Sequence, residues 1–119
     1  MLRRQLKREI RKPLILMTPK SLLRHKRAVS KLEEFGPDTS FHRILPDDAE
    51  TGGEIKLAED AKIRRVVICS GKVYYDLLDA REEKGVDDVY IMRLEQFYPW
   101  PVKSLSTELS RFPNAELVW

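Results

Sequence analysis

The chain has 119 residues, of which 42% are hydrophobic and 34% are charged, a balance typical of one small globular domain and unlike that of a disordered chain. No apolar run is long enough to cross a bilayer, and the basic residues that follow Met1 lack the apolar stretch of a secretory signal. The single cysteine, Cys69, excludes an internal disulfide framework and is typical of a protein from a reducing compartment.

The net charge of +3 hides a division of charge along the chain. Residues 1–31 contain 11 of the 22 basic side chains and one acidic side chain, which gives +10. Residues 32–119 contain 11 basic and 18 acidic side chains, which gives −7. A basic arm beside an acidic body suggests nucleic-acid binding, but the first aromatic residue is Phe35, so the arm has no platform on which bases could stack. We therefore favour a solvated or domain-bridging basic helix and expect no nucleic-acid partner.

The basic arm is predicted to begin with a helix. Leu2, Leu6 and Ile10 recur every four residues, which predicts a helix over residues 1–12 with one narrow apolar stripe. Such a stripe needs a partner surface, so we expect it to pack on another chain or on elements outside this segment. Pro13 ends the helix, residues 14–17 are predicted to form a short buried strand, and helical turns are expected at residues 21–24 and 30–35.

Strand and helix patterns alternate in the rest of the chain. The first of these are a strand at 41–45, a surface loop at 46–53 and a strand at 66–69. A helix from Val73 to Gly85 follows, with Val73, Tyr74, Leu77 and Leu78 on its inner face. The last three are a strand at 89–94, a helix from Pro101 to Phe112 and a strand at 115–119. This order predicts an α/β fold with a mostly parallel sheet and helices on both faces. Trp119 is expected in a central strand, and we interpret both ends of the chain as cut.

Polar side chains follow two neighbouring strands of the predicted sheet. Ser70, expected to cap the next helix, and Lys72 follow the strand at 66–69, and Arg93 ends the next strand. We call these three residues the rim. The carboxyl edge of a parallel sheet and a helix N-terminus both favour anionic ligands, so one hypothesis is a phosphate or nucleotide pocket. The alternative is an ordinary capped helix beside a salt-bridged edge, and the spacing leaves both open. His25 and His42 are isolated, and no phosphate-loop consensus is present.

Three ordered stretches, residues 13–25, 66–78 and 93–101, resemble the C-terminal part of the thiamine-diphosphate-dependent, decarboxylating component of 2-oxoglutarate dehydrogenases. The resemblance implies a transketolase-like C-terminal domain over residues 41–119, truncated at its end, whose first strand is antiparallel to the others. It also implies that residues 1–25 are the tail of a pyrimidine-binding domain, with helix and strand, and that residues 26–40 form a linker.

The resemblance also implies what the parent enzyme does. Such an enzyme decarboxylates 2-oxoglutarate on thiamine diphosphate with magnesium, and passes succinyl to a lipoyl domain. Its partners would be a second copy of itself, a lipoyl-bearing succinyltransferase and dihydrolipoamide dehydrogenase, in the bacterial cytoplasm or the mitochondrial matrix.

The chain itself departs from the family's catalytic pattern. It has no Gly-Asp-Gly…Asn motif for the diphosphate and magnesium, and neither His25 nor His42 matches the family's substrate-binding histidines. We therefore assign no catalytic, cofactor-binding or metal-binding residue, and expect an inactive, dimer-bracing segment in which the rim could hold an effector. The alternative hypothesis is a free-standing phosphate- or nucleotide-binding α/β module.

Overall fold

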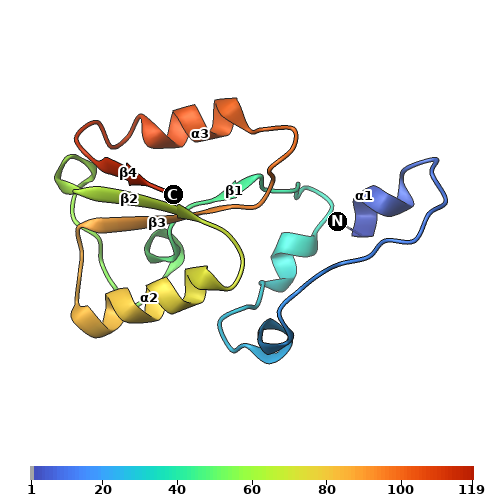
Figure 1. Ribbon diagram of the computed structural model, residues 1–119, viewed down its shortest axis with the longest axis horizontal. Helices are drawn as coiled ribbons and strands as arrows, with labels where there is room; N and C mark the ends of the chain where they lie inside the picture. The colour runs from blue at the N-terminus through green and yellow to red at the C-terminus, as the bar shows by residue number, and fades with distance from the viewer. Residues whose placement is uncertain (1) are drawn as a thin grey trace.

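A four-stranded mixed sheet organises the chain in the computed structural model, which describes residues 2–119, with side chains from Arg4 onward (Figure 1). The strands are β1 (Ile44–Leu45), β2 (Arg65–Cys69), β3 (Val89–Leu94) and β4 (Glu116–Val118), in the order β1-β3-β2-β4. β1 is antiparallel to β3, whereas β2 is parallel to both β3 and β4. The predicted α/β class, the mostly parallel sheet and the antiparallel first strand are confirmed.

Helices α2 (Val73–Lys84) and α3 (Val102–Leu109) cover opposite faces of the sheet (Figure 1). Since side chains of a strand alternate between faces, β3 supplies both cores. Ile91 packs with α2 residues, while Tyr90 and Met92 pack with Leu105 of α3 and with Phe112. Helices on both faces are therefore confirmed. The closer likeness to a transketolase C-terminal domain stays a prediction.

Two glycines set the ends of α2. Gly71 has φ +65° in the turn that leaves β2, and Gly85 has φ +61° at the C-cap, a left-handed conformation that side chains with a Cβ rarely adopt. The predicted glycine C-cap is thus confirmed. The prediction that Ser70 caps the helix is wrong, because the N-cap is Lys72 and its side chain makes no capping hydrogen bond to the helix backbone. The helix begins two residues later than a Ser70 cap requires.

The inner face of α2 is rotated from the predicted one. Tyr74 and Leu78 are buried as expected, but Val73 is 47% exposed, so its placement on the inner face is wrong. Tyr75 and Arg81 are buried instead. Because Tyr74, Leu78 and Arg81 are spaced by four and three residues, they lie along one side of the helix, and that side faces the sheet.

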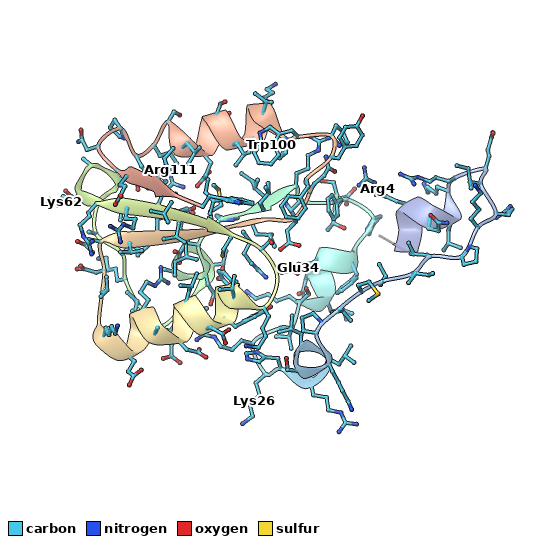
Figure 2. All side chains as sticks on the ribbon, viewed as in Figure 1. Arg4, Lys26, Glu34, Lys62, Trp100 and Arg111 are labelled. Atoms are coloured by element: carbon cyan, nitrogen blue, oxygen red, sulfur yellow. The ribbon has the colours of Figure 1, made fainter. Side chains whose placement is uncertain are left out.

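The N-terminal segment is less regular than predicted. Helix α1 spans Leu2–Leu6 and not residues 1–12, of which residue 1 lies outside the described part. Residues 14–17 form no strand and are exposed, since a strand needs a neighbouring strand for its backbone hydrogen bonds and none of the described strands pairs with them. Arg4 of α1, labelled in Figure 2, links this segment to the body, because its guanidinium donates to the side chain of Gln96 at 3.3 Å. Leu6 and Ile10 are exposed, so packing on elements outside this segment stays a prediction.

Short helical turns and one edge strand complete the fold. The predicted turns appear as 3-10 helices at Lys20–Arg24 and Leu32–Phe35, and two further ones lie at Asp48–Thr51 and Asp60–Lys62. The last strand is present, and within the described chain β4 pairs with β2 alone and forms an edge of the sheet. A central position for this strand in the parent domain stays a prediction. No helix in the described residues is long and apolar enough to span a membrane.

Candidate functional site

The rim residues lie where two neighbouring parallel strands end. Cys69, the last residue of β2, is in register with Arg93 of β3. Ser70 is the next residue after Cys69, so its backbone lies close to that of Arg93. Lys72 is exposed, and its Nζ lies 2.8 and 2.9 Å from the two carboxylate oxygens of Asp76 one turn later. The structure therefore brings the three backbones to one edge of the sheet, while an acid of α2 already pairs with the ammonium of Lys72.

The guanidinium of Arg93 lies against two tyrosines of α2. It is 4.3 Å from the ring centroid of Tyr74, a cation–π distance, and its Nη1 reaches the hydroxyl of Tyr75 at 3.5 Å. Its Nε is buried and has no hydrogen-bond partner among the described residues. Burial raises the pKa of Tyr74 to about 12, so this phenol is neutral at physiological pH. Arg93 is therefore held beneath α2, and phosphate binding by the rim stays a prediction.

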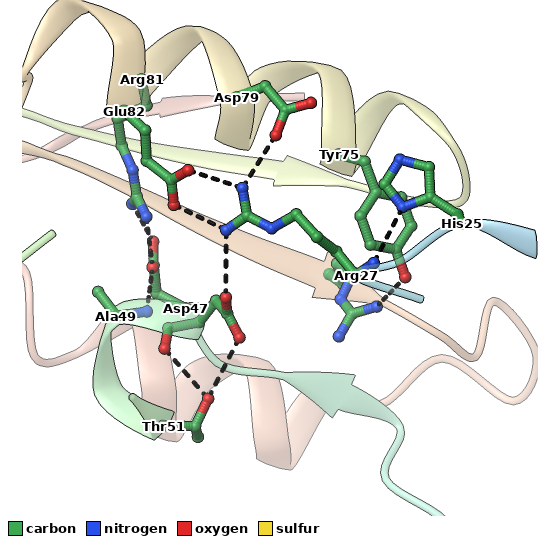
Figure 3. Close-up of polar contacts among 11 residues, drawn as sticks. His25, Arg27, Asp47, Ala49, Thr51, Tyr75, Asp79, Arg81 and Glu82 are labelled. Carbon is green, nitrogen blue, oxygen red and sulfur yellow. Dashed lines mark hydrogen bonds and ion pairs between the residues drawn. The ribbon is translucent and has the colours of Figure 1, made fainter. Parts of the chain in front are cut away.

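A buried ion pair, which sequence reasoning did not find, joins α2 to the loop after β1 (Figure 3). Asp47 is 0% exposed and Arg81 is 5% exposed. The carboxylate accepts hydrogen bonds from Arg81 at 2.5 and 2.9 Å, from the backbone N–H of Ile91 at 2.6 Å and from that of Ala49 at 2.9 Å. Both carboxylate oxygens are thus satisfied, and the predicted surface loop at 46–53 is in fact anchored in the core.

A second polar network holds the same loop on the α3 face. The Tyr90 hydroxyl donates to Glu108 at 2.6 Å and accepts the backbone N–H of Asp47 at 3.2 Å. Arg111 donates to Glu108, to Glu50 of the loop and to Asp60 of the following 3-10 helix. Burial and the Glu108 bond raise the pKa of Tyr90 well above its ordinary value. The loop is therefore also held on the α3 face, through the backbone of Asp47 and the carboxylate of Glu50.

Arg27 ties the predicted linker to α2 (Figure 3). Its guanidinium donates two hydrogen bonds to Glu82, at 2.6 and 2.7 Å, and a third to Asp79 at 2.9 Å. The ring of His25 lies 4.7 Å from that of Tyr75, centroid to centroid. Residues 22–28 are thus docked on the helix. The domain boundaries proposed from the resemblance stay a prediction.

The Arg27→Ala variant is expected to lose about 1 kcal/mol of unfolding free energy at pH 7, because a partly buried bidentate ion pair is removed. The hydrogen bond from Arg27 lowers the pKa of Glu82 below its usual 4.5. A lowered pKa stabilises the fold above the unfolded-state value, and this contribution is lost as pH falls through the folded-state pKa. Urea unfolding should therefore show a difference between variant and parent that shrinks from pH 7 to pH 3. Arg24→Ala, at an exposed arginine, is the matched control. A difference independent of pH would contradict this assignment.

Two cavities lie on the described surface. One of about 230 Å³ is bordered by Glu50, Asp60 and the buried rings of Tyr90 and Phe112. The other, of about 290 Å³, lies at the start of α3 beside Gln96 and Trp100. The described residues contain no group of three side chains able to hold a metal ion.

Some of these features left a signal in the sequence. Arg81 occupies the same helical stripe as Tyr74 and Leu78, and an arginine at an inner-face position requires a buried acid. The acid that pairs with Arg81 is Asp47. Sequence spacing alone does not distinguish it from the other acidic residues at 46–60. Cys69, the last residue of β2, is buried, and burial raises the pKa of its thiol, which keeps it protonated.

Known proteins match the chain over nearly its full length. A family model described as 2-oxoglutarate dehydrogenase C-terminal matches residues 29–119. The 2-oxoglutarate dehydrogenase E1 component of Brucella anthropi is 66% identical over 120 residues, and those of Brucella ovis and Brucella canis are 65% identical. Each match covers 99% of this chain, whereas the chain spans 12% of the length of each relative.

These matches leave the free-standing effector module without support. They include the stretches on which the resemblance was based, residues 66–78 and 93–101, and the family description names the C-terminal region of the enzyme. This chain belongs to the 2-oxoglutarate dehydrogenase C-terminal family.

Proposed function

We propose that this chain is a structural, dimer-bracing part of an enzyme that decarboxylates 2-oxoglutarate and transfers succinyl to a lipoyl domain. The observation that carries the proposal is the 66% identity to an E1 component over 99% of the chain. The parent would act as an oxidoreductase of the tricarboxylic acid cycle, in the bacterial cytoplasm or the mitochondrial matrix. Its partners would be a second copy, a lipoyl-bearing succinyltransferase and dihydrolipoamide dehydrogenase.

We infer that thiamine diphosphate and magnesium are held by the rest of the parent chain. The sequence has no Gly-Asp-Gly motif, and the described side chains do not provide a metal-binding group of three. When bound, the cofactor supplies the carbanion chemistry of decarboxylation. This segment would contribute rigidity to the parent enzyme. Its two hydrophobic cores and the buried Asp47–Arg81 pair would keep its surface fixed where neighbouring domains pack against it.

A chimera tests the proposal. The C-terminal region of the Brucella anthropi E1 component that matches this chain is replaced by the 119 residues, and 2-oxoglutarate-dependent ferricyanide reduction is measured. We expect activity within about threefold of the unmodified relative, because the two segments are 66% identical and substitutions that keep the fold usually have small effects. The comparison protein is the same relative with the region deleted, which should lose dimerisation and activity.

Two results would contradict the proposal. A folded, dimeric chimera without activity would show that the chain does not serve this parent. A deletion protein that is as dimeric and as active as the intact relative would show that the region braces nothing. Loss of thiamine diphosphate binding in a deletion protein that remains dimeric would instead place the cofactor site in this segment.

A further inference from the structure

Residues 22–28, which we call the strap, are the one docked part of a long exposed stretch. Among residues 11–35, only members of the strap are partly buried, and all other residues are exposed. Leu22, His25 and Ala28 are partly buried, and their spacing of three residues places them on one side of the 3-10-like turns that form the strap. The strap therefore lies against the body along one side, with exposed chain before and after it.

The backbone of the strap is not joined to the hydrogen-bonded framework of the body. The amides of Leu22, His25 and Ala28 donate to carbonyls three residues earlier, at 3.1, 3.3 and 3.1 Å. The amide of Arg27 donates to Nδ1 of His25 at 3.3 Å. Within the described chain, no backbone hydrogen bond connects the strap to α2 or to the sheet. Side chains alone therefore hold the strap in place.

Arg27 is the one residue of the strap that forms ion pairs within the described chain (Figure 3). Its guanidinium lies among three carboxylates, those of Glu82 and Asp79 on α2 and that of Asp48, 3.5 Å away. The Arg27 side chain is 27% exposed and that of Glu82 is 14% exposed, so solvent screens this contact only in part. Three acids gathered at one place repel one another without a cation, so Arg27 acts as a latch between the strap and the body.

The apolar contacts of the strap are few, and they lie beside the rim. Leu22 and Ala28 pack against the core cluster that includes Tyr75, and the ring of His25 lies 4.7 Å from that of Tyr75. The hydroxyl of Tyr75 in turn lies 3.5 Å from Nη1 of Arg93. The strap therefore covers a side chain that contacts the rim.

We propose that the strap opens and closes as one unit on a body that remains folded, with Arg27 as its latch, and that opening uncovers Tyr75 beside the rim. A segment held by a few side chains belongs to the low-stability part of a structure, where local opening is more frequent than global unfolding. Opening also frees the chain before residue 22 to change its orientation relative to the body. The proposal goes beyond the bracing function and does not depend on it.

Amide hydrogen exchange of the isotopically labelled 119-residue chain, followed by NMR, tests the proposal. The probes are the hydrogen-bonded amides of the strap, those of Leu22, His25, Arg27 and Ala28. We expect them to share one protection factor, at least about tenfold below that of the β3 amides. Leu105→Ala, in the core on the opposite face of the sheet, should lower the protection of β3 by about thirtyfold or more. The same variant should leave the strap amides unchanged within about twofold, because the strap opens without the body.

Variants of the latch separate its charge from ordinary packing. Arg27→Ala should lower the protection of the strap amides about fivefold, and Arg27→Lys should lower it less, because lysine keeps the charge but not the forked hydrogen bonds. Arg24→Ala, at an exposed arginine of the strap, is the matched control and should behave like the parent. Sodium chloride at about 1 M should lower strap protection in the parent but not in Arg27→Ala.

Three outcomes would overturn the proposal. Strap amides that lose protection together with β3 in Leu105→Ala would show that the strap opens only when the whole body unfolds. Strap amides that are unprotected in the parent would show that the strap is not closed in solution. Unchanged protection in Arg27→Ala would show that Arg27 is not the latch.

Discussion

The Asp47→Ala variant is expected to lose about 3–5 kcal/mol of unfolding free energy, because it leaves the Arg81 guanidinium buried without a counter-charge. The carboxylate also accepts the backbone N–H groups of Ile91 and Ala49, so three donors lose their acceptor together. Since small domains are stable by roughly 5–15 kcal/mol, such a loss takes a large fraction of the total. Urea unfolding followed by circular dichroism measures it.

The neighbouring aspartate supplies the matched control. Asp48 is partly exposed, and its closest ion pair is Arg27 at 3.5 Å. Asp48→Ala should therefore cost less than about 1 kcal/mol, as exposed ion pairs usually do. Asp47→Asn separates two contributions, because an amide oxygen can still accept a backbone N–H but cannot balance the charge of Arg81. Equal stabilities for Asp47→Ala and Asp48→Ala would show that the buried pair does not stabilise the fold.

The Leu78→Ala variant is expected to lose about 2–5 kcal/mol, the usual cost of truncating a fully buried leucine. Leu78 is 1% exposed and belongs to the core between α2 and the sheet. Val73→Ala on the same helix should change stability by less than about 1 kcal/mol, because Val73 is half exposed and alanine favours helix. Thermal and urea unfolding of both variants give the comparison. Comparable losses at the two positions would restore the inner face predicted from the sequence.

Both predictions bear on the bracing function. The Asp47–Arg81 pair joins the loop after β1 to α2, and Leu78 joins α2 to the sheet. In the parent enzyme, either loss is expected to loosen the domain. Activity in the chimera described above should then fall together with stability, and an active-site defect without a stability change would argue for a direct catalytic role.

The sequence by itself determined the fold class, the family and, from residue 66 onward, the order of strands and helices. Strands were predicted from apolar runs such as residues 66–69 and 89–94, and the end of a helix was predicted from Gly85. These signals are local, because they depend on the propensities of neighbouring residues and not on distant contacts. The antiparallel first strand came from the resemblance and was also confirmed. The match at 66% identity confirmed the family.

Only the tertiary structure decided which side chains meet. Whether residues 14–17 form a strand depends on a pairing partner, and whether Val73 or Arg81 faces the sheet depends on how α2 is rotated when it packs. Asp47 and Arg81 are separated by 34 residues, and no local pattern selects one acid among those at 46–60. Long-range pairing is set by burial and charge balance in the folded state, which a single sequence does not display.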